Sequence, residues 1–310
     1  MDDYLTKSFY NVFGNVKTLN PFCAELNVEL NFIKTNPAMN MTVFVKDRLP
    51  EEHYAKIADK LMSYDSIYAE QIGYIEPAEN PASDTRLHMM GGEFCGNAVR
   101  SLAVYTAYKN PEKYFCGKKD VCDVIVEVYG EKTPLTCSVK KTKRENLFYS
   151  TVSMPLPISD LTVVKELGGI KNVKRLNFDG ITHFAVNEND FADLSQKEQF
   201  FEHVKSYMQC QIPKYKAFGI MFYDKGKNFI TPLVYVKPTN SLFWEKSCAS
   251  GTSALACILS YIGGNAVKQD FEEPGGKLSV STDFSDIKIK KIVLGGDIEI
   301  VAEGKVFVDF

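Results

Sequence analysis

Two look-alike segments, one in each half of the 310-residue chain, place a cysteine before an apolar run. They read Glu93-Phe94-Cys95-Gly96-Asn97-Ala98 and Glu245-Lys246-Ser247-Cys248-Ala249-Ser250-Gly251-Thr252. Both following runs carry a leucine, an alanine and a tyrosine at the same offsets from the cysteine. Such a repeated motif indicates an internal duplication. The sequence therefore predicts two similar domains, each with its cysteine at the start of a helix.

Strand-like alternation of apolar and polar residues is more frequent along the chain than helical periodicity. Each half has one strongly apolar helix, expected at 98–108 and at 253–262, where Gly263-Gly264 ends it. Residues 287–308 alternate in the pattern of two or three closing strands. These patterns predict an α+β protein whose domains each wrap strands around a buried helix, after an N-terminal extension at 1–26.

Composition excludes several classes of partner. The net charge of −3 gives no electrostatic reason to expect nucleic acid or an anionic membrane. No run of about 18 apolar residues is present, so no membrane span is expected. The N-terminus lacks the pattern of a secretory signal. The eight cysteines form no C-x-x-C pair and the four histidines are scattered, so no metal site is expected. We therefore expect a cytoplasmic protein with reduced thiols.

The helix start expected for each cysteine decides the chemistry open to it. Four backbone N–H groups lack intrahelical partners there, and the helix carries about half a positive charge. Both effects stabilise a thiolate and can lower a cysteine pKa from about 8.5 to roughly 3.5–7.5. We predict that Cys95 and Cys248 form an acid/base pair with lowered pKa values. One thiolate would take a proton, and the other thiol would return one from the opposite face.

The same free N–H groups can bind a carboxylate. Removal of the α-proton of an amino acid leaves negative charge on its carboxylate, which donors at both helix starts would stabilise. The predicted donors are the backbone N–H groups of Gly96, Asn97, Ala249, Ser250 and Gly251. Because these donors can carry the charge, neither a metal ion nor pyridoxal phosphate is expected as a cofactor.

At these two loops the sequence resembles the diaminopimelate epimerase-like superfamily of cofactor-independent racemases. It shares most with the histidine racemases that begin staphylopine-type metallophore synthesis, over about residues 28–310. Further segments that look like theirs read Asn36-Pro37-Ala38-Met39-Asn40-Met41-Thr42, Glu70-Gln71-Ile72-Gly73-Tyr74-Ile75-Glu76 and Ser241-Leu242-Phe243-Trp244. The resemblance implies two epimerase-type domains, each a curved, mostly antiparallel sheet around a central helix, with the active site in the cleft between them. The implied bounds are 27–154 with a closing strand at 297–310, and 155–296.

The resemblance also implies roles for individual residues. Cys95 and Cys248 match the acid/base pair of the superfamily. Asn40, Gln71 and Asn97 match positions where the superfamily holds the α-amino and carboxylate groups of its substrate.

The residues expected around the substrate's side chain differ from those of true diaminopimelate epimerases. Those enzymes carry a Glu-Arg-Gly-Ala-Gly-type stretch before the second cysteine, where this chain has Trp244-Glu245-Lys246-Ser247. A second zwitterionic end would therefore be left unpaired, at a cost of about a few kcal/mol. Candidates to meet a basic or imidazole side chain instead are Glu70, Glu245 and His88. The alternative for each is a solvated or structural side chain, and Trp244 is expected to pack.

These observations predict an amino-acid racemase, with L-histidine as the best single substrate. A diaminopimelate epimerase is an alternative enzyme. Phenazine-type isomerases share the fold but lack the cysteine pair. A non-catalytic amino-acid binding protein would not need two thiols. Dimers are common in the superfamily, which makes a homodimer a candidate assembly.

Overall fold

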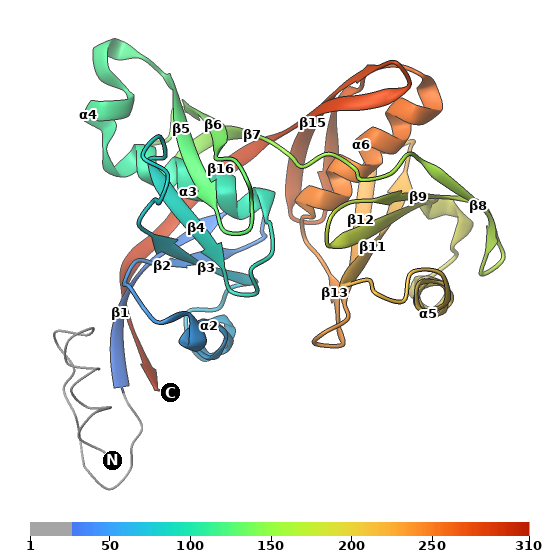
Figure 1. Ribbon diagram of the computed structural model, residues 1–310, viewed down its shortest axis with the longest axis horizontal. Coiled ribbons are helices and arrows are strands. Elements are labelled where there is room, and N and C mark those ends of the chain that lie inside the picture. The colour runs from blue at the N-terminus through green and yellow to red at the C-terminus, as the bar shows by residue number, and fades with distance from the viewer. Residues whose placement is uncertain (1–26, 310) are drawn as a thin grey trace, which may run out of the picture. The chain divides into compact units, whose positions relative to one another are not determined.

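The computed structural model describes residues 27–309, which form a mixed α+β protein with many more strands than helices (Figure 1). The α+β class predicted from the sequence is confirmed. The predicted extension at 1–26 lies outside the described residues. By their contacts, the described residues divide into two compact units. Unit 1 comprises 27–37, 41–148 and 298–309, and unit 2 comprises 38–40 and 149–297.

Unit 1 contains the strands of the first half of the chain. Their bounds are β1 (Asn27–Asn36), β2 (Thr42–Val45), β3 (Gln71–Glu76), β4 (Thr85–Met89), β5 (Val121–Val128), β6 (Leu135–Lys141) and β7 (Leu147–Ser153), the last of which leads into unit 2. The pairs β1–β2, β3–β4 and β5–β6 are antiparallel, whereas β2–β3 and β4–β5 are parallel. Each parallel pair requires a crossover, which the helices of the unit provide.

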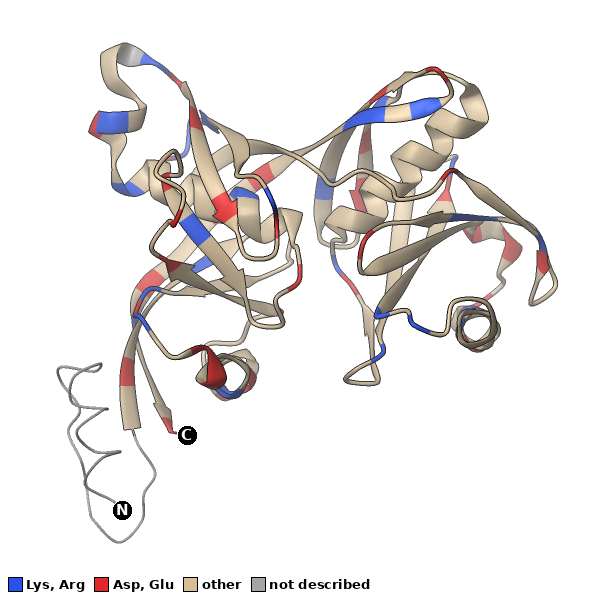
Figure 2. Ribbon diagram, in the orientation of Figure 1, with Lys and Arg blue, Asp and Glu red and all other residues tan. Residues whose placement is uncertain are grey.

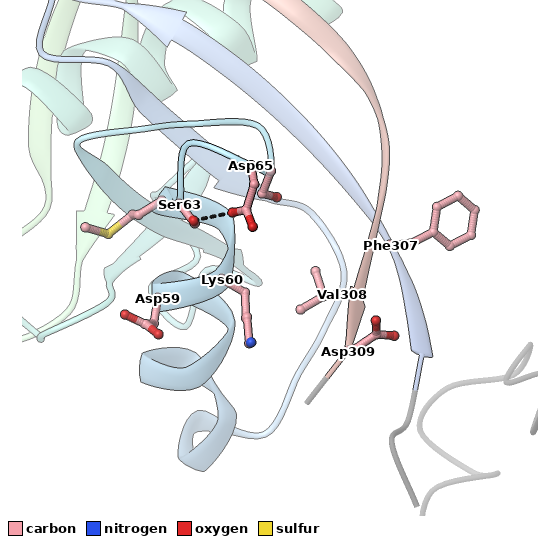
Figure 3. A pocket seen from close by; sticks show the side chains of 9 residues that line it. Asp59, Lys60, Ser63, Asp65, Phe307, Val308 and Asp309 are labelled. Atoms are coloured by element: carbon pink, nitrogen blue, oxygen red, sulfur yellow. Dashed lines mark hydrogen bonds between the residues drawn. The ribbon is translucent and has the colours of Figure 1, made fainter. Parts of the chain in front are cut away.

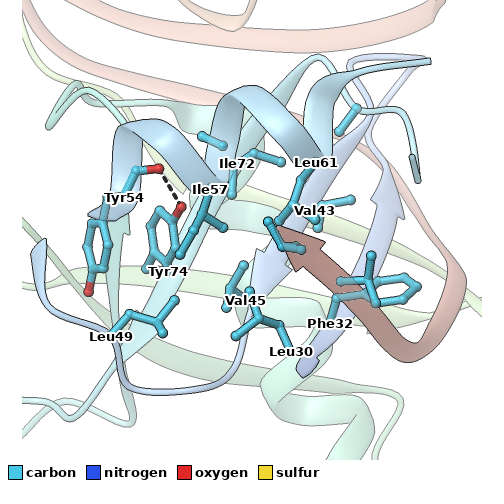
Figure 4. Close-up of a cluster of buried hydrophobic side chains, with 14 of the residues drawn as sticks. Leu30, Phe32, Val43, Val45, Leu49, Tyr54, Ile57, Leu61, Ile72 and Tyr74 are labelled. Atoms are coloured by element: carbon cyan, nitrogen blue, oxygen red, sulfur yellow. Dashed lines mark hydrogen bonds between the residues drawn. The ribbon is translucent and has the colours of Figure 1, made fainter. Parts of the chain in front are cut away.

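The helices of unit 1 cover and fill this sheet. Their bounds are η1 (Glu51–His53), α2 (Tyr54–Met62), α3 (Gly96–Lys109), α4 (Pro111–Tyr114) and η2 (Cys116–Lys118). Almost every residue of α3 is buried, and the helix packs on β4, β5 and β6. Figure 4 shows how α2 contributes Ile57 and Leu61 to an apolar cluster with Val43, Val45 and Ile72 of the neighbouring strands.

Unit 2 repeats the mixture of strand directions. Its strands are β8 (Thr162–Leu167), β9 (Ile170–Asn177), β10 (Ile181–Asn187), β11 (Ala217–Asp224), β12 (Phe229–Val236), β13 (Ser241–Trp244), β14 (Lys268–Glu273) and β15 (Gly276–Ser285). The pairs β8–β9, β9–β10, β11–β12, β12–β13 and β14–β15 are antiparallel, and β10–β11 and β12–β14 are parallel.

The helices of unit 2 are η3 (Glu188–Asp190), α5 (Leu194–Gln211) and α6 (Ala249–Gly263). The amphipathic α5 buries Phe200, Phe201 and Val204 in an aromatic-rich core. The more apolar α6 packs on β9, β10, β11 and β15. It ends at Gly264, whose φ of 68° confirms the predicted glycine stop.

The chain closes with one long strand, β16 (Lys288–Asp309), which runs through both units without a turn. Its first part pairs with β15 and its last part with β1, both antiparallel. The prediction of two or three closing strands is therefore wrong. Register shifts opposite Asp283/Phe284 and Lys34/Thr35 absorb the breaks in alternation as β-bulges, which a sequence pattern cannot distinguish from turns. Within 27–309, no helix has the length and apolar character needed to cross a bilayer.

Candidate active site

Cys95 caps the N-terminus of α3. The residue is extended (φ −131°, ψ 109°), and its thiol accepts a hydrogen bond from the backbone N–H of Ala98 at 3.5 Å. The backbone N–H of Asn97 and the side-chain amide of Gln71 also stabilise the ionised thiol. Gln71 begins β3, and its Nε2 donates to Thr42 Oγ1 at 2.7 Å. The structure therefore brings the predicted residues Cys95, Gln71 and Asn97 together in unit 1.

A buried arginine holds the first turn of α3. Arg100 is fully buried and donates from Nη2 to Oδ1 of Asn97 at 2.7 Å. Gly96 and Asn97 are buried as well. A hydrogen bond to a charged group contributes about 1.5–3 kcal/mol. The side-chain oxygen of Asn97 thus fixes the helix start, while its backbone N–H reaches the Cys95 thiol.

Cys248 caps α6 in unit 2 with a similar backbone conformation (φ −118°, ψ 97°). It is 5% exposed, and its Sγ lies 3.7 Å from Ser250 Oγ. The backbone N–H of Gly251 stabilises the ionised thiol, and the carboxyl group of Glu245 hydrogen-bonds to the thiol. Unit 2 therefore gathers Cys248, Glu245 and the predicted donors at 249–251. Glu245 lies against the thiol, a contact that the sequence did not predict.

The predicted lowering of the cysteine pKa values is wrong for both thiols. Burial raises the pKa of Cys95 to about 11, although backbone N–H groups of α3 and the amide of Gln71 act in the opposite direction. Burial also raises the pKa of Cys248 well above its ordinary value, and the carboxyl groups of Glu245 and Glu273 add to this when they are ionised. Transfer of a thiolate out of water costs more free energy than the hydrogen bonds from the N–H groups at the helix start contribute. Both thiols are therefore protonated at neutral pH.

His183 on β10 belongs to the surroundings of Cys248, although the sequence did not single it out as a site residue. Its Nε2 lies 3.1 Å from Ser250 Oγ, the hydroxyl that contacts the Cys248 thiol. Burial lowers the pKa of His183 to about 3, so the ring is neutral. Gly219 makes room for it, because a Cβ there would lie 2.5 Å from His183 Nδ1. The feature that could have identified it is a histidine within the buried stretch 182–186 of β10.

Glu273, at the end of β14, is a second residue that the sequence did not single out. Its Oε2 accepts a hydrogen bond from the backbone N–H of Cys248 at 2.8 Å, and its Oε1 is hydrogen-bonded to the hydroxyl of Thr252. It is 3% exposed, and burial raises the pKa of its carboxyl group to about 8. The sequence feature that could have identified it is the alternation of strand residues, which places Glu273 on the same buried face as Phe271.

Asn40 and Glu70 lie on the loops that lead into β2 and β3. Asn40 is 8% exposed and follows Ala38 and Met39, both of which have left-handed backbone conformations. The backbone N–H of Glu70 donates to Met41 O at 2.8 Å. Their assigned roles toward a substrate stay predictions.

His88 and Trp244 make contacts that favour the structural interpretation of each. The His88 ring stacks on Tyr129 with centroids 3.7 Å apart, and its Nδ1 lies 3.0 Å from Glu76 Oε1. Trp244 stacks on Phe222 at 5.8 Å and packs against the core of unit 2. Both rings thus contribute to packing within their own units.

Two surface pockets involve none of the predicted site residues. The larger, of about 540 Å³, lies in unit 1 and is lined by residues from 59–66 and 307–309 (Figure 3). The other, of about 250 Å³, lies in unit 2 and is lined by residues from 177–182 and 212–217 together with Ile158. Charged side chains of both signs are distributed over both units (Figure 2). Among residues 27–309, no group of three or more His, Cys, Asp or Glu side chains could hold a metal ion.

Comparison with known proteins identifies the family. The model of the histidine racemase CntK N-terminal domain matches residues 29–307. A histidine racemase of Fusobacterium nucleatum subsp. nucleatum is 33% identical over 282 residues, which cover 90% of this chain and 97% of that protein. A histidine racemase of Staphylococcus aureus is 27% identical over 289 residues, 90% of this chain and 98% of that protein.

Solved structures support the fold. A probable proline racemase from Agrobacterium radiobacter superposes with a TM-score of 0.62 over 89% of this chain and 92% of that one, at 11% identity. A hydroxyproline epimerase from Agrobacterium vitis gives 0.63 over 91% and 93%, at 9% identity. At such identities the likeness concerns the fold alone. Because the family model spans nearly all of the described residues, the chain belongs to the histidine racemase family and is an isomerase.

Proposed function

We propose that this protein is a cofactor-independent racemase of L-histidine that uses Cys95 and Cys248 as two acid/base groups. One observation carries the proposal. In a chain of the histidine racemase family, each of these cysteines stands at the N-cap of a buried helix, and at least one backbone N–H group near the start of that helix stabilises its ionised thiol. Outside the two caps, the cysteines of the described part of the chain hold no such position.

In the proposed reaction, one thiolate removes the α-proton of the bound amino acid, and the other thiol delivers its proton to the opposite face of Cα. The electron pair left on Cα spreads into the substrate carboxylate, where the helix-start N–H groups stabilise it. One proton is taken and one is given, so the two thiols exchange protonation states in each turnover. No electron is transferred to or from the protein.

The raised pKa values set a condition on this mechanism. A thiol with a pKa of about 11 is ionised in only about one molecule in ten thousand at pH 7. When it is ionised, it is a strong base, as abstraction of a weakly acidic α-proton requires. We infer that the α-ammonium group of the bound substrate lowers the pKa of the nearer thiol, because a positive charge within about 4–6 Å favours a thiolate.

We also propose the finer architecture that this chemistry needs. Two epimerase-type domains, at 27–154 with 297–310 and at 155–296, would each wrap a curved sheet around a central helix and share an active site in the cleft between them. Asn40, Gln71 and Asn97 would hold the α-amino and carboxylate groups, and Glu70 and Glu245 would meet the imidazole. A cytoplasmic location and a homodimer stay predictions.

The experiment is a panel of L-amino acids incubated with the purified protein, with each product separated by chiral chromatography. We expect D-histidine to form from L-histidine without added pyridoxal phosphate, at a rate that metal chelators leave unchanged. Turnover of diaminopimelate in place of histidine would favour the epimerase alternative. Binding of an amino acid without racemisation or α-proton exchange would favour a non-catalytic binding protein and contradict the proposal.

A further inference from the structure

We infer that Glu273 is held as a neutral carboxylic acid and that it positions Cys248 through the backbone N–H and the backbone carbonyl group of that cysteine. The N–H of Cys248 donates to Glu273 Oε2 at 2.8 Å. The carbonyl oxygen of Cys248 accepts a hydrogen bond from Thr252 Oγ1 at 2.7 Å. The same Thr252 hydroxyl is hydrogen-bonded to the other oxygen of Glu273.

The contacts of the Thr252 hydroxyl accommodate a proton on the Glu273 carboxyl group. A threonine hydroxyl has a single proton to donate. Thr252 Oγ1 nevertheless lies at hydrogen-bond distance from two acceptors, Cys248 O and Glu273 Oε1. If the Thr252 proton goes to Cys248 O, the contact with Oε1 is a hydrogen bond only when Glu273 supplies its own proton. The neutral acid satisfies all three contacts at once.

Burial and the neighbouring charges favour the same protonation state. Glu273 is 3% exposed, and an ionised carboxylate is costly to bury unless it is paired. The titratable groups that face it are the carboxyl group of Glu245 and the thiol of Cys248, neither of which carries positive charge. The pKa of Glu273 is accordingly raised to about 8, chiefly by burial, although the hydrogen bonds from Thr252, Cys248 and Ser247 oppose the rise.

The turn that follows Glu273 helps to hold Glu273 beside Cys248. The backbone N–H of Gly275 donates to Lys246 O at 2.7 Å, so the end of β14 is tied to the loop before Cys248. Gly275 also packs against Ala38, because a Cβ at position 275 would lie 2.1 Å from Ala38 O. Glu273 therefore acts as a positioning residue through Cys248 and does not itself touch the reacting atoms.

Neutrality matters for the chemistry, and this part of the inference rests on the proposed function. An ionised Glu273 adds negative charge beside the Cys248 thiol and raises its pKa further. A neutral Glu273 gives the same backbone contacts without opposing the thiolate. The enzyme is therefore expected to lose activity as Glu273 ionises at alkaline pH.

The first test needs no activity. In the folded chain the pKa of Glu273 is raised above the unfolded value of about 4.3. Its contribution to stability is therefore complete below about pH 4 and is lost as the pH rises toward 8. We expect the Tm of the wild type to fall more steeply from pH 5 to pH 9 than that of Glu273→Gln, which cannot ionise. The exposed neighbour Glu272 gives a matched control, and Glu272→Gln should follow the wild type. Parallel curves for wild type and Glu273→Gln would overturn the inference.

Infrared spectroscopy of the full-length wild type measures the protonation state directly. The carbonyl stretch of a protonated carboxylic acid should be present at pH 6.5, disappear as the pH passes about 8, and be missing in Glu273→Gln. A carboxylate at pH 6.5 would contradict the inference even if the variant failed to fold.

Kinetics test the positioning role. Glu273→Ala should lower kcat about tenfold or more. Glu273→Gln should recover most of that loss, because its amide oxygen can accept from Cys248 N–H and its amide nitrogen can donate to Thr252. The alkaline limb of kcat/KM should move to higher pH in the glutamine variant. Equal loss in both variants, or an unmoved limb, would contradict this role. If the wild type racemises no amino acid, the proposed function fails, whereas the stability and infrared results still decide the state of Glu273.

Discussion

Cys95→Ser and Cys248→Ser are each expected to lower the rate of histidine racemisation by about 10²–10⁴-fold, the usual contribution of a general acid or base. A serine hydroxyl keeps the size and the hydrogen bonds of the thiol, but it ionises far less readily. Each variant should still exchange the α-proton of one enantiomer with solvent through its remaining thiol, and the two variants should differ in which enantiomer they exchange. Chiral chromatography measures racemisation, and NMR in heavy water measures exchange.

Two exposed thiols provide the matched controls for these substitutions. Cys116 and Cys210 are both exposed, and their serine variants should racemise at the wild-type rate. Circular dichroism spectra should be the same for all four variants, since the side-chain volume hardly changes. Wild-type turnover in either Cys95→Ser or Cys248→Ser would exclude the two-thiol mechanism.

Gly251→Ala is expected to disrupt the second cysteine loop. A Cβ at this position would lie 2.2 Å from Met221 Sδ and 3.1 Å from Cys248 Sγ. Met221 is fully buried and cannot move into solvent. Overpacking of this kind costs about 1–3 kcal/mol of folding free energy. Displacement of a reacting group by about 1 Å can cost about 10²-fold in rate. Thermal melting and kcat measure the two effects.

The cause of the Gly251→Ala effect can be isolated with a double-mutant cycle. Met221→Ala removes the atoms that the new methyl group would meet, so Gly251→Ala should cost much less stability and activity in that background than in the wild type. Gly263→Ala is the control in the same helix, because a Cβ there meets only the exposed side chain of Asn265. Equal costs of Gly251→Ala in both backgrounds would show that the contact with Met221 is not the cause.

The sequence located the two cysteine-bearing helices because their apolar runs are long and end in clear signals. It placed their starts two to four residues late, at 98 and 253 instead of Gly96 and Ala249. Small polar residues such as Asn97 and Ser250 are typical of loops. Here they form the first helical turns, and the cysteines are the caps. Strand β8 was not predicted, because it is a short, largely exposed strand at the edge of the sheet, where it pairs with β9.

The contacts that surround Cys248 could not be predicted, because they join residues that are distant in the chain. His183 reaches Ser250 across 67 positions, and Glu273 reaches Cys248 across 25. The prediction of lowered thiol pKa values was wrong for a related reason. A helix start is a local feature that lowers a thiol pKa, whereas burial is a property of the whole fold and here has the larger effect.

The central claim, that one thiol takes the α-proton and a different thiol returns one, is tested most directly by isotope incorporation at low conversion. L-histidine is incubated with the protein in heavy water, and the two enantiomers are separated and analysed for deuterium at Cα. Two bases predict that newly formed D-histidine carries deuterium while the remaining L-histidine keeps its original hydrogen. Retention of the original hydrogen in D-histidine, or equal early labelling of both enantiomers, would indicate a single base and contradict the mechanism.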